Sequence, residues 1–156
     1  MPEFRQDPIT GRYVIIASNR SNRPRHCDDQ IEPAYSLACP FCEGNEIMTP
    51  PEIYAQREPH SLADTPGWRV RAVPNKYPAL EDIGQWSEAN QSHYKLWAGV
   101  GVHEVIIENP HHIVNIGALD ENQFINILRA YQARLTTLRK DRRWRCLLVY
   151  KNHGEA

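Results

Sequence analysis

The sequence predicts an α+β domain in which an antiparallel sheet is combined with one long helix. Two observations indicate this class: short apolar or alternating segments are separated by long excursions, and a single amphipathic helix precedes the last of them. This order favours an antiparallel sheet, because the regular alternation of strands and helices typical of a parallel sheet is missing. A chain of 156 residues suffices for one compact core, so we expect a single module over residues 1–156.

Four segments are expected to form strands. Residues 13–17 read Tyr-Val-Ile-Ile-Ala after a turn at 7–11, which predicts a short buried strand. Residues 68–73 alternate in the manner of a half-buried strand that Pro74 ends. Residues 103–108 form the third segment and 145–150 the last.

One helix is predicted over about residues 121–140. Asp120 and Gln123 have the spacing of a capping box, and the cationic pair Arg139 and Lys140 suits the negative end of the helix dipole. Apolar side chains recur at helical spacing, as in an amphipathic helix: Phe124, Ile127, Leu128, Tyr131, Leu135 and Leu138.

One region is expected to be mostly irregular: residues 26–66, which are rich in proline, acidic and small side chains. Residues 81–99 are polar and weakly patterned, and no strand or helix is predicted there. An irregular region as long as 26–66 is unusual in a compact domain unless something holds it in place.

Charge and composition exclude several classes of protein. Lys plus Arg number 18 and Asp plus Glu 19, so the net charge of −1 disfavours a nucleic-acid partner. The N-terminus has no apolar core of a signal peptide, and no stretch approaches the length of a membrane span. The cysteines at 27, 39, 42 and 146 make a poor disulfide framework. We therefore expect a cytoplasmic protein with no membrane partner, whose cysteines bind metal.

Cys39-Pro40-Phe41-Cys42 is the sharpest local signal. Two thiolates at this spacing can hold one tetrahedral ion, which favours Zn²⁺ over a redox pair or two incidental cysteines. The pair supplies half a site, and histidine is the obvious supplement. The doublet of His111 and His112 follows a strand end and a proline, although a surface imidazole explains either residue equally well. Two further residues are weaker candidates: Cys27 lies in a polar loop, and His103 is expected to pack or hydrogen-bond within its strand.

Arg20 and Arg23 follow the first expected strand, and their planar guanidinium groups suit a diphosphate. A solvated polar loop accounts for the same residues. Asn75 and Asn152 each follow a strand end, where an amide can bind a ribose, base or phosphate group or merely cap a turn.

The order of these motifs resembles the galactose-1-phosphate uridylyltransferases. The resemblance runs through nearly the whole chain, in the segments 7–15, 20–24, 39–46, 73–80, 101–112 and 150–156. It implies the first, N-terminal one of the two related α+β modules of a histidine-triad superfamily enzyme. Such an enzyme takes part in galactose metabolism, where it exchanges UMP between UDP-glucose and galactose 1-phosphate through a uridylyl-histidine intermediate.

The resemblance also assigns residues. Cys39, Cys42 and His112 match zinc ligands, and nucleotide contacts match Arg20, Arg23, Asn75 and Asn152. The partners implied are a UDP-sugar and a sugar 1-phosphate, with a homodimer as the full-length state. The family's His-x-His motif, which supplies a fourth zinc ligand and the nucleophile, has no match here, so we expect the 156-residue chain to be inactive alone. Two alternatives stay open: a related enzyme for another nucleotide, such as an ADP-glucose phosphorylase, and a non-catalytic zinc-stabilised binding module.

Overall fold

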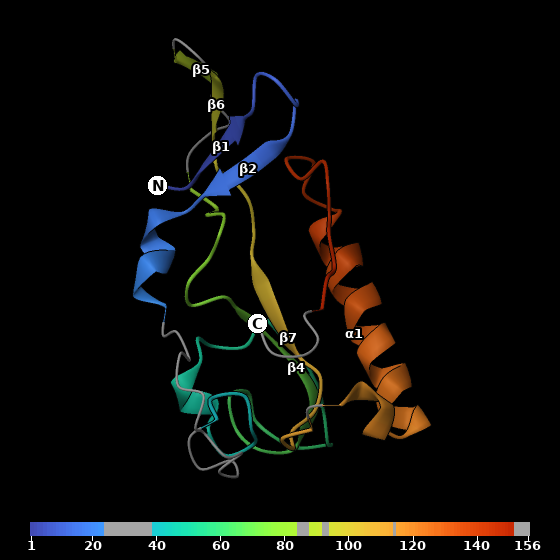
Figure 1. Cartoon of the computed structure of the whole chain (residues 1–156). Coiled ribbons are helices and arrows are strands. Elements are labelled where there is room, and N and C mark those ends of the chain that lie inside the picture. Colours follow the sequence, from blue (N-terminus) through green and yellow to red (C-terminus); the bar gives the residue numbers. More distant parts are fainter. Residues whose placement is uncertain (24–38, 84–87, 92–93, 114, 152–156) are drawn as a thin grey trace.

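The computed structural model describes residues 1–23, 39–83, 88–91, 94–113 and 115–151 (Figure 1). The α+β class is confirmed, with two small antiparallel sheets in place of the single expected sheet. The first sheet has the order β2-β1-β6-β5, and it contains β1 (Glu3–Gln6), β2 (Tyr13–Ile16), β5 (Glu88–Gln91) and β6 (Tyr94–Ala98). The second has the order β3-β4-β7, formed by β3 (Tyr54–Arg57), β4 (Trp68–Pro74) and β7 (Glu104–Ile107).

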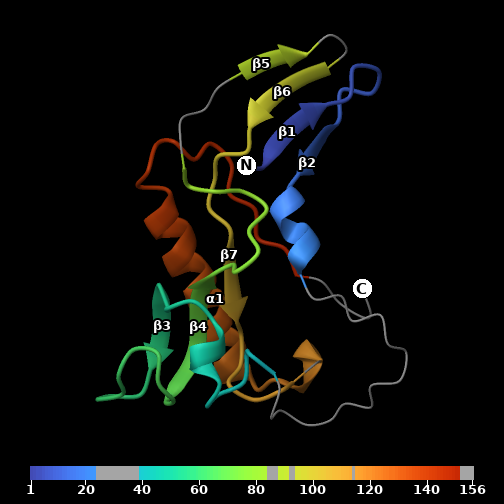
Figure 2. The ribbon, with the colours of Figure 1, turned by 90° about the vertical axis from the view of Figure 1, so that its left-hand side faces the viewer.

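The two sheets lie at opposite ends of the molecule, and the helix α1 (Glu121–Leu138) runs along one face of the second sheet (Figures 1 and 2). Strand β4 is the centre of this half, because it pairs with β3 on one side and β7 on the other. Val70 of β4 packs against Ile127 and Ala130 of α1, and all three side chains are fully buried. A second apolar cluster contains Trp68, Val73 and Ile107. No helix in the described part of the chain is long and apolar enough to cross a bilayer.

The start of α1 confirms the predicted cap, because the Asp120 carboxylate accepts a hydrogen bond of 2.9 Å from the backbone N–H of Gln123. The return bond of a capping box is replaced by a tertiary one. The Gln123 amide instead donates to the backbone carbonyls of Arg69 (2.8 Å) and Glu108 (2.5 Å), which anchors the helix to β4 and to the end of β7.

The buried face of α1 only partly follows the apolar spacing. Ile127 is buried, whereas Phe124 and Leu128 are 43% and 49% exposed. Polar Gln123 and Asn126 lie inside instead. Gln123 is buried because its amide binds strand carbonyls, a role that hydrophobic spacing does not reveal.

Three predictions about strands are wrong. Residues 145–150 form no strand in the described structure. They are attached to the β7 region through side chains, with the Tyr150 hydroxyl 3.4 Å from His103 Nε2 and the Lys151 ammonium bound to Glu108. The strand over 13–17 exists as β2, but its four side chains are exposed rather than buried because β2 is an edge of its sheet. The half-buried pattern expected of 68–73 is also wrong, because every residue of this segment except Arg69 is buried.

Four strands were missed. β1 lies in a polar N-terminus, β5 and β6 lie in the weakly patterned segment 81–99, and β3 lies in the region 26–66 that was expected to be mostly irregular. β1, β3 and β5 are only four residues long, too short for periodicity to register. The residues from 24 to 38 lie outside the described structure, so the expectation of irregular structure stays untested there.

Candidate metal centre and nucleotide site

A tight turn places the two cysteines of the Cys-x-x-Cys motif on the same side of the chain. The backbone N–H of Cys42 donates to the carbonyl of Cys39 (3.2 Å), and the Asn45 side chain donates to the same carbonyl (2.8 Å). Gly44 follows with a φ of 91°, a left-handed conformation that glycine adopts without strain. Its N–H donates to the buried carboxylate of Glu46, which also accepts from the Trp68 indole at 2.7 Å.

The turn is held against the segment that carries the histidine doublet. The backbone N–H of Glu43 donates to the carbonyl of Pro110 at 2.8 Å, two positions before His112. As a result, Cys42 Sγ lies 3.6 Å from His112 Nδ1. The ligand atoms of Cys39, Cys42 and His112 all lie within 4.8 Å of one another. His111 is outside this group. Residue type and spacing left the two histidines open, and the family resemblance had favoured His112.

The donor set fits a tetrahedral ion of the zinc type. Zn–S bonds of about 2.3 Å and Zn–N bonds of about 2.0 Å at tetrahedral angles separate neighbouring ligand atoms by about 3.5–3.8 Å. The sulfur–nitrogen separation of 3.6 Å lies in this interval. Within the described residues no fourth Cys, His, Asp or Glu joins the cluster. Cys27, the weaker candidate, lies outside those residues.

Burial, reinforced by the neighbouring Cys39, raises the pKa of the Cys42 thiol to about 11. Burial and the neighbouring Cys39 sulfur both disfavour the negatively charged thiolate form of Cys42. A divalent cation between the two sulfurs removes that penalty, because it binds the thiolate form and releases the proton. The three side chains could therefore hold a metal ion.

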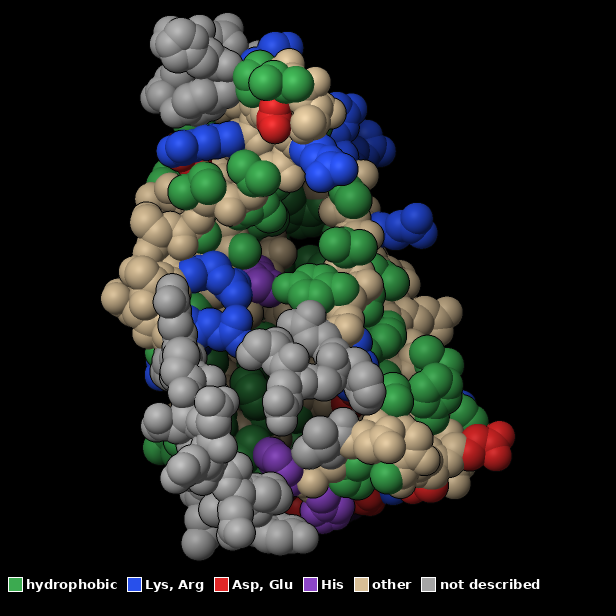
Figure 3. Space-filling model, viewed as in Figure 1, with side chains coloured by type: hydrophobic (Ala, Val, Ile, Leu, Met, Phe, Trp, Pro, Cys, Tyr) green, Lys and Arg blue, Asp and Glu red, His purple; other side chains and the backbone are tan. Residues whose placement is uncertain are grey.

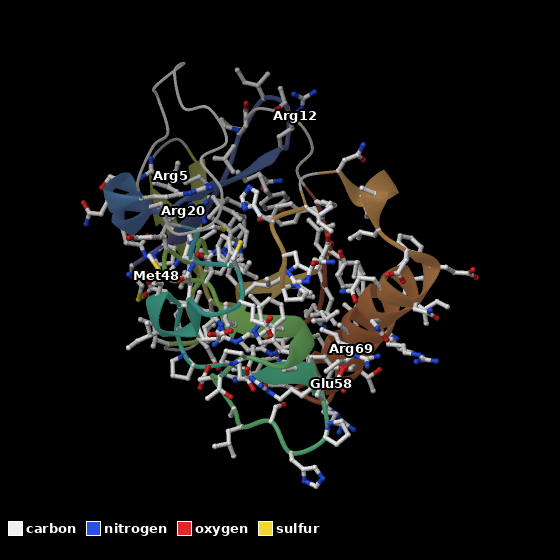
Figure 4. All side chains as sticks on the ribbon, turned by 90° about the horizontal axis from the view of Figure 1, so that it is seen from below. Arg5, Arg12, Arg20, Met48, Glu58 and Arg69 are labelled. Atoms are coloured by element: carbon white, nitrogen blue, oxygen red, sulfur yellow. The ribbon has the colours of Figure 1, made fainter. Side chains whose placement is uncertain are left out.

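Arg20, Arg23 and Asn75 gather in a second place, around His103. Arg20 lies on the 3-10 helix η1 (Ser18–Asn22) and donates to the backbone carbonyl of Tyr77 at 2.9 Å. Arg23 caps the same helix. Figure 4 shows Arg20 on η1, well apart from Arg12 in the β1–β2 connection. Among the described residues neither Arg20 nor Arg23 is paired with a carboxylate, so two cations at this site lack a counter-ion there.

The Asn75 side chain organises the turn after β4. Its Oδ1 accepts from the backbone N–H of Tyr77 at 2.8 Å, and the backbone N–H of Asn75 donates to the carbonyl of His103 at 2.9 Å. The His103 ring completes the turn, because Nδ1 accepts from the N–H of Ala79 at 2.9 Å. Burial lowers the pKa of His103, and the charges of Arg20 and Arg23 lower it further. A space-filling view shows a histidine next to a group of basic side chains midway along this face (Figure 3).

Sequence reasoning expected His103 to pack or hydrogen-bond, and the hydrogen bonds are confirmed. What the sequence did not indicate is that His103 stands between the expected nucleotide residues. Asn152 lies outside the described structure, but Tyr150, two positions before it, approaches the His103 ring. A cavity of about 370 Å³ also borders His103 on the side of α1, lined by Pro74, Val102, Glu104, Arg134 and Trp144 among others. None of Arg20, Arg23 and Asn75 lines it, so cavity and arginine cluster are separate features.

The fold and the cysteine–histidine cluster define a class: an α+β module with three side chains that could hold a metal ion. Comparison with known proteins is more specific. All of residues 1–156 match the galactose-1-phosphate uridyl transferase, N-terminal domain, family model, so the chain belongs to this family of nucleotidyltransferases.

Individual proteins that are similar to this chain are enzymes of the same kind. An ADP-glucose phosphorylase from Arabidopsis thaliana is 32% identical over 160 residues, which cover 99% of this chain and 44% of that protein. The solved structure of an ADP-glucose phosphorylase from Arabidopsis thaliana with bound ADP-glucose has a TM-score of 0.50 at 31% identity, covering 91% of this chain and 40% of the other. A uridylyltransferase structure gives a TM-score of 0.56 at 25% identity, covering 88% and 36%. The chain thus spans less than half the length of these relatives.

Proposed function

We propose that this chain is the nucleotide-sugar-binding module of an enzyme that exchanges UMP between UDP-glucose and galactose 1-phosphate. One observation carries the proposal: Arg20 and Arg23, without carboxylate partners in the described structure, lie near enough to the Asn75–His103 turn that both charges add to burial in lowering the pKa of His103. Two planar guanidinium groups beside amide donors suit the two phosphates of a nucleotide sugar.

Each residue then has a role in binding. Arg20 and Arg23 hold the diphosphate, and their charge stabilises the transferring phosphoryl group. Asn75 and Asn152 bind ribose or phosphate oxygens through their amides. The family resemblance supplies the rest of the reaction, a histidine nucleophile that forms a uridylyl-histidine intermediate. No residue of this chain is proposed for that role. The same resemblance motivates a histidine-triad superfamily fold, a cytoplasmic location and a homodimer for the full-length enzyme.

Zn²⁺ is the metal that we propose for the cluster of Cys39, Cys42 and His112. In the family that the chain resembles, four protein ligands surround the zinc ion, which implies a structural rather than a catalytic role. Such an ion supplies folding energy by joining segments that few other contacts connect. In this chain it fastens the turn at Cys39–Cys42, part of a long irregular region, to the segment that follows β7. The bond from Glu43 to Pro110 acts in the same direction.

A specific observation supports a second candidate for the nucleotide sugar that this site binds. The relative that is 32% identical is an ADP-glucose phosphorylase, which makes ADP-glucose the alternative ligand of the same site. The residues that bind phosphate serve either nucleotide equally, since they do not contact the base.

Calorimetric titration of this chain with UDP-glucose, ADP-glucose and GDP-mannose tests both candidates. We expect one of the first two to bind at least about tenfold more tightly than GDP-mannose, and Arg20→Gln or Arg23→Gln to weaken that binding about tenfold, the loss of one charge-assisted hydrogen bond. Arg12→Gln is the matched control, because this exposed arginine lies away from Arg20 (Figure 4). Nucleotide-sugar binding that is absent, or that is equally strong in all three variants, contradicts the proposal.

A further inference from the structure

We propose that His103 is the positioning residue of the nucleotide site: its ring holds the turn that carries Asn75 beside the segment that leads to Asn152. The inference rests on the nucleotide-binding function proposed above. It adds His103 to the arginines and asparagines that the proposal already assigns to the nucleotide. His103 touches no nucleotide in this proposal and acts through the residues that do.

Three contacts of His103 carry the inference. Its Nδ1 accepts from the Ala79 N–H at 2.9 Å, and its backbone carbonyl accepts from the Asn75 N–H at 2.9 Å, so it grips the turn at both ends. Its Nε2 lies 3.4 Å from the Tyr150 hydroxyl, on a segment that no backbone ladder fixes within the described residues. One side chain therefore joins two binding segments that are far apart in the sequence.

The acceptor role of Nδ1 determines the tautomer. In a neutral imidazole one nitrogen donates and the other accepts, so Nε2 carries the proton. That proton is available to the Tyr150 oxygen. The Asn75 Nδ2 atom, 3.2 Å from the same nitrogen, is then a neighbour rather than a hydrogen-bond partner, because both groups are donors. The ring thus accepts from the turn and donates towards the C-terminal segment.

If the turn moves, the residues proposed to bind phosphate move with it. Tyr77 lies in the middle of the turn, its N–H bound by Asn75 and its carbonyl accepting from Arg20. Loss of the bond between His103 and Ala79 frees one end of the turn. Arg20 and Asn75 then lose their common support, so the effect on nucleotide binding is mediated by position and not by contact.

The surroundings keep the ring neutral. Burial is the main reason for the lowered pKa of His103, and the charges of Arg20 and Arg23 on η1 add to it. The other titratable or charged groups around the ring come from the C-terminal segment and the adjoining cavity: Tyr150, Asp82, Glu104, Arg134 and Asp141. The three carboxylates among them are already paired with arginines, at 2.7 Å for Glu104 with Arg134 and at 2.7 and 2.6 Å for Asp82 and Asp141 with Arg143.

Two substitutions separate the acceptor from the donor side of the ring. In His103→Asn the amide oxygen can take the place of Nδ1 and accept from Ala79, whereas in His103→Gln the terminal amide nitrogen takes the place of Nε2. We expect His103→Asn to bind the preferred nucleotide sugar within about threefold of the wild type and His103→Gln to bind about tenfold more weakly, because Ala79 N–H then lacks its acceptor. Equal losses in the two variants, or no loss in either, overturn the inference.

His60→Asn is the matched control. His60 lies on the exposed loop between β3 and β4, and its φ of 71° is a conformation that asparagine tolerates. The probes are UDP-glucose and ADP-glucose, whose phosphates are diesters without a second ionisation near neutral pH. Absence of nucleotide binding by the wild-type chain contradicts the proposed function, whereas binding that is indifferent to His103 substitution contradicts only the role of His103.

A second measurement needs no nucleotide. In an NMR titration from about pH 7.5 to about pH 5, we expect the Ala79 amide resonance to move with the same midpoint as the His103 ring protons, because an imidazolium cannot accept a hydrogen bond. The movement should be absent in His103→Asn and unchanged in His60→Asn. An Ala79 amide that stays still while the ring titrates overturns the inference, and this result can be read even if a variant fails to fold.

Discussion

Cys42 Sγ and His112 Nδ1 lie 3.6 Å apart although 70 positions separate the two residues in the sequence. The contact joins the turn at the start of the described region 39–83 to the segment that follows β7. A backbone hydrogen bond from Glu43 to Pro110 holds the two segments together beside this contact.

Metal binding should depend on all three residues of this cluster. We expect purified wild-type chain to contain about one zinc ion per molecule and Cys39→Ala, Cys42→Ala and His112→Ala each to lose most of it, because each removes one ligand of a single tetrahedral ion. Mass-spectrometric metal analysis measures this directly. Cys146→Ala is the control, since Cys146 is an exposed cysteine outside the cluster. Unchanged zinc in all three ligand variants contradicts the assignment.

Arg71 should be a main determinant of stability. Its side chain is 1% exposed and binds Glu52 (3.0 Å), Asp64 (2.5 Å) and Thr49 (2.8 Å), which fastens the loops around β3 to β4. Arg71→Met removes one charged donor from each of these acceptors inside a buried network, so we expect a loss of roughly 3 kcal/mol in the free energy of unfolding.

Denaturant unfolding of two matched variants checks this value. Arg69 lies on the same strand and pairs with Glu58, but both side chains are more than half exposed. Arg69→Met should therefore cost no more than about 1 kcal/mol, the usual contribution of a surface ion pair. Similar losses in the two variants would show that the buried position of Arg71 does not matter.

Acid should weaken the same network. Burial by itself would raise the pKa of Glu52, but hydrogen bonds from Arg57 and Arg71 outweigh it and the pKa is lowered from its ordinary value of 4.5. Because the unfolded chain binds the proton more readily, this contribution to stability is present above about pH 4.5 and is lost as the pH falls through the folded pKa. The free energy of unfolding, measured between about pH 6 and about pH 3, should thus decrease more steeply with falling pH for the wild type than for Glu52→Gln. Parallel curves would contradict the linkage.

The N-cap of α1 offers a local test. Asp120→Ala removes the acceptor for the Gln123 N–H, and we expect it to cost about 1 kcal/mol in the free energy of unfolding. Asp120→Asn keeps a capping oxygen, so its cost should be only a few tenths of a kcal/mol. Thermal unfolding followed by circular dichroism compares them, and equal midpoints for the two variants would exclude a capping role.

Much of the fold and of the family could be predicted from the sequence. Helix α1, its cap, and the strands β4 and β7 were predicted because their residues carry strong local signals: helical spacing, a capping pair, and prolines that end strands. The motif order likewise predicted the family that the whole chain matches. The four missed strands and the lost strand at 145–150 share one reason. A short segment becomes a strand only when another strand offers a free edge, and its own residues do not encode that edge.

The sequence by itself determined which residue types are available: a Cys-x-x-Cys pair, a histidine doublet, an arginine pair and amides after strands. Only the tertiary structure decided which of them meet. It brought His112, the histidine that the family resemblance had matched, to the two cysteines, and it placed His103 between the turn of Asn75 and the segment of Tyr150. The reason is physical: these contacts depend on backbone hydrogen bonds between segments far apart in the chain, and such bonds are specified by sheet pairing and packing rather than by local sequence.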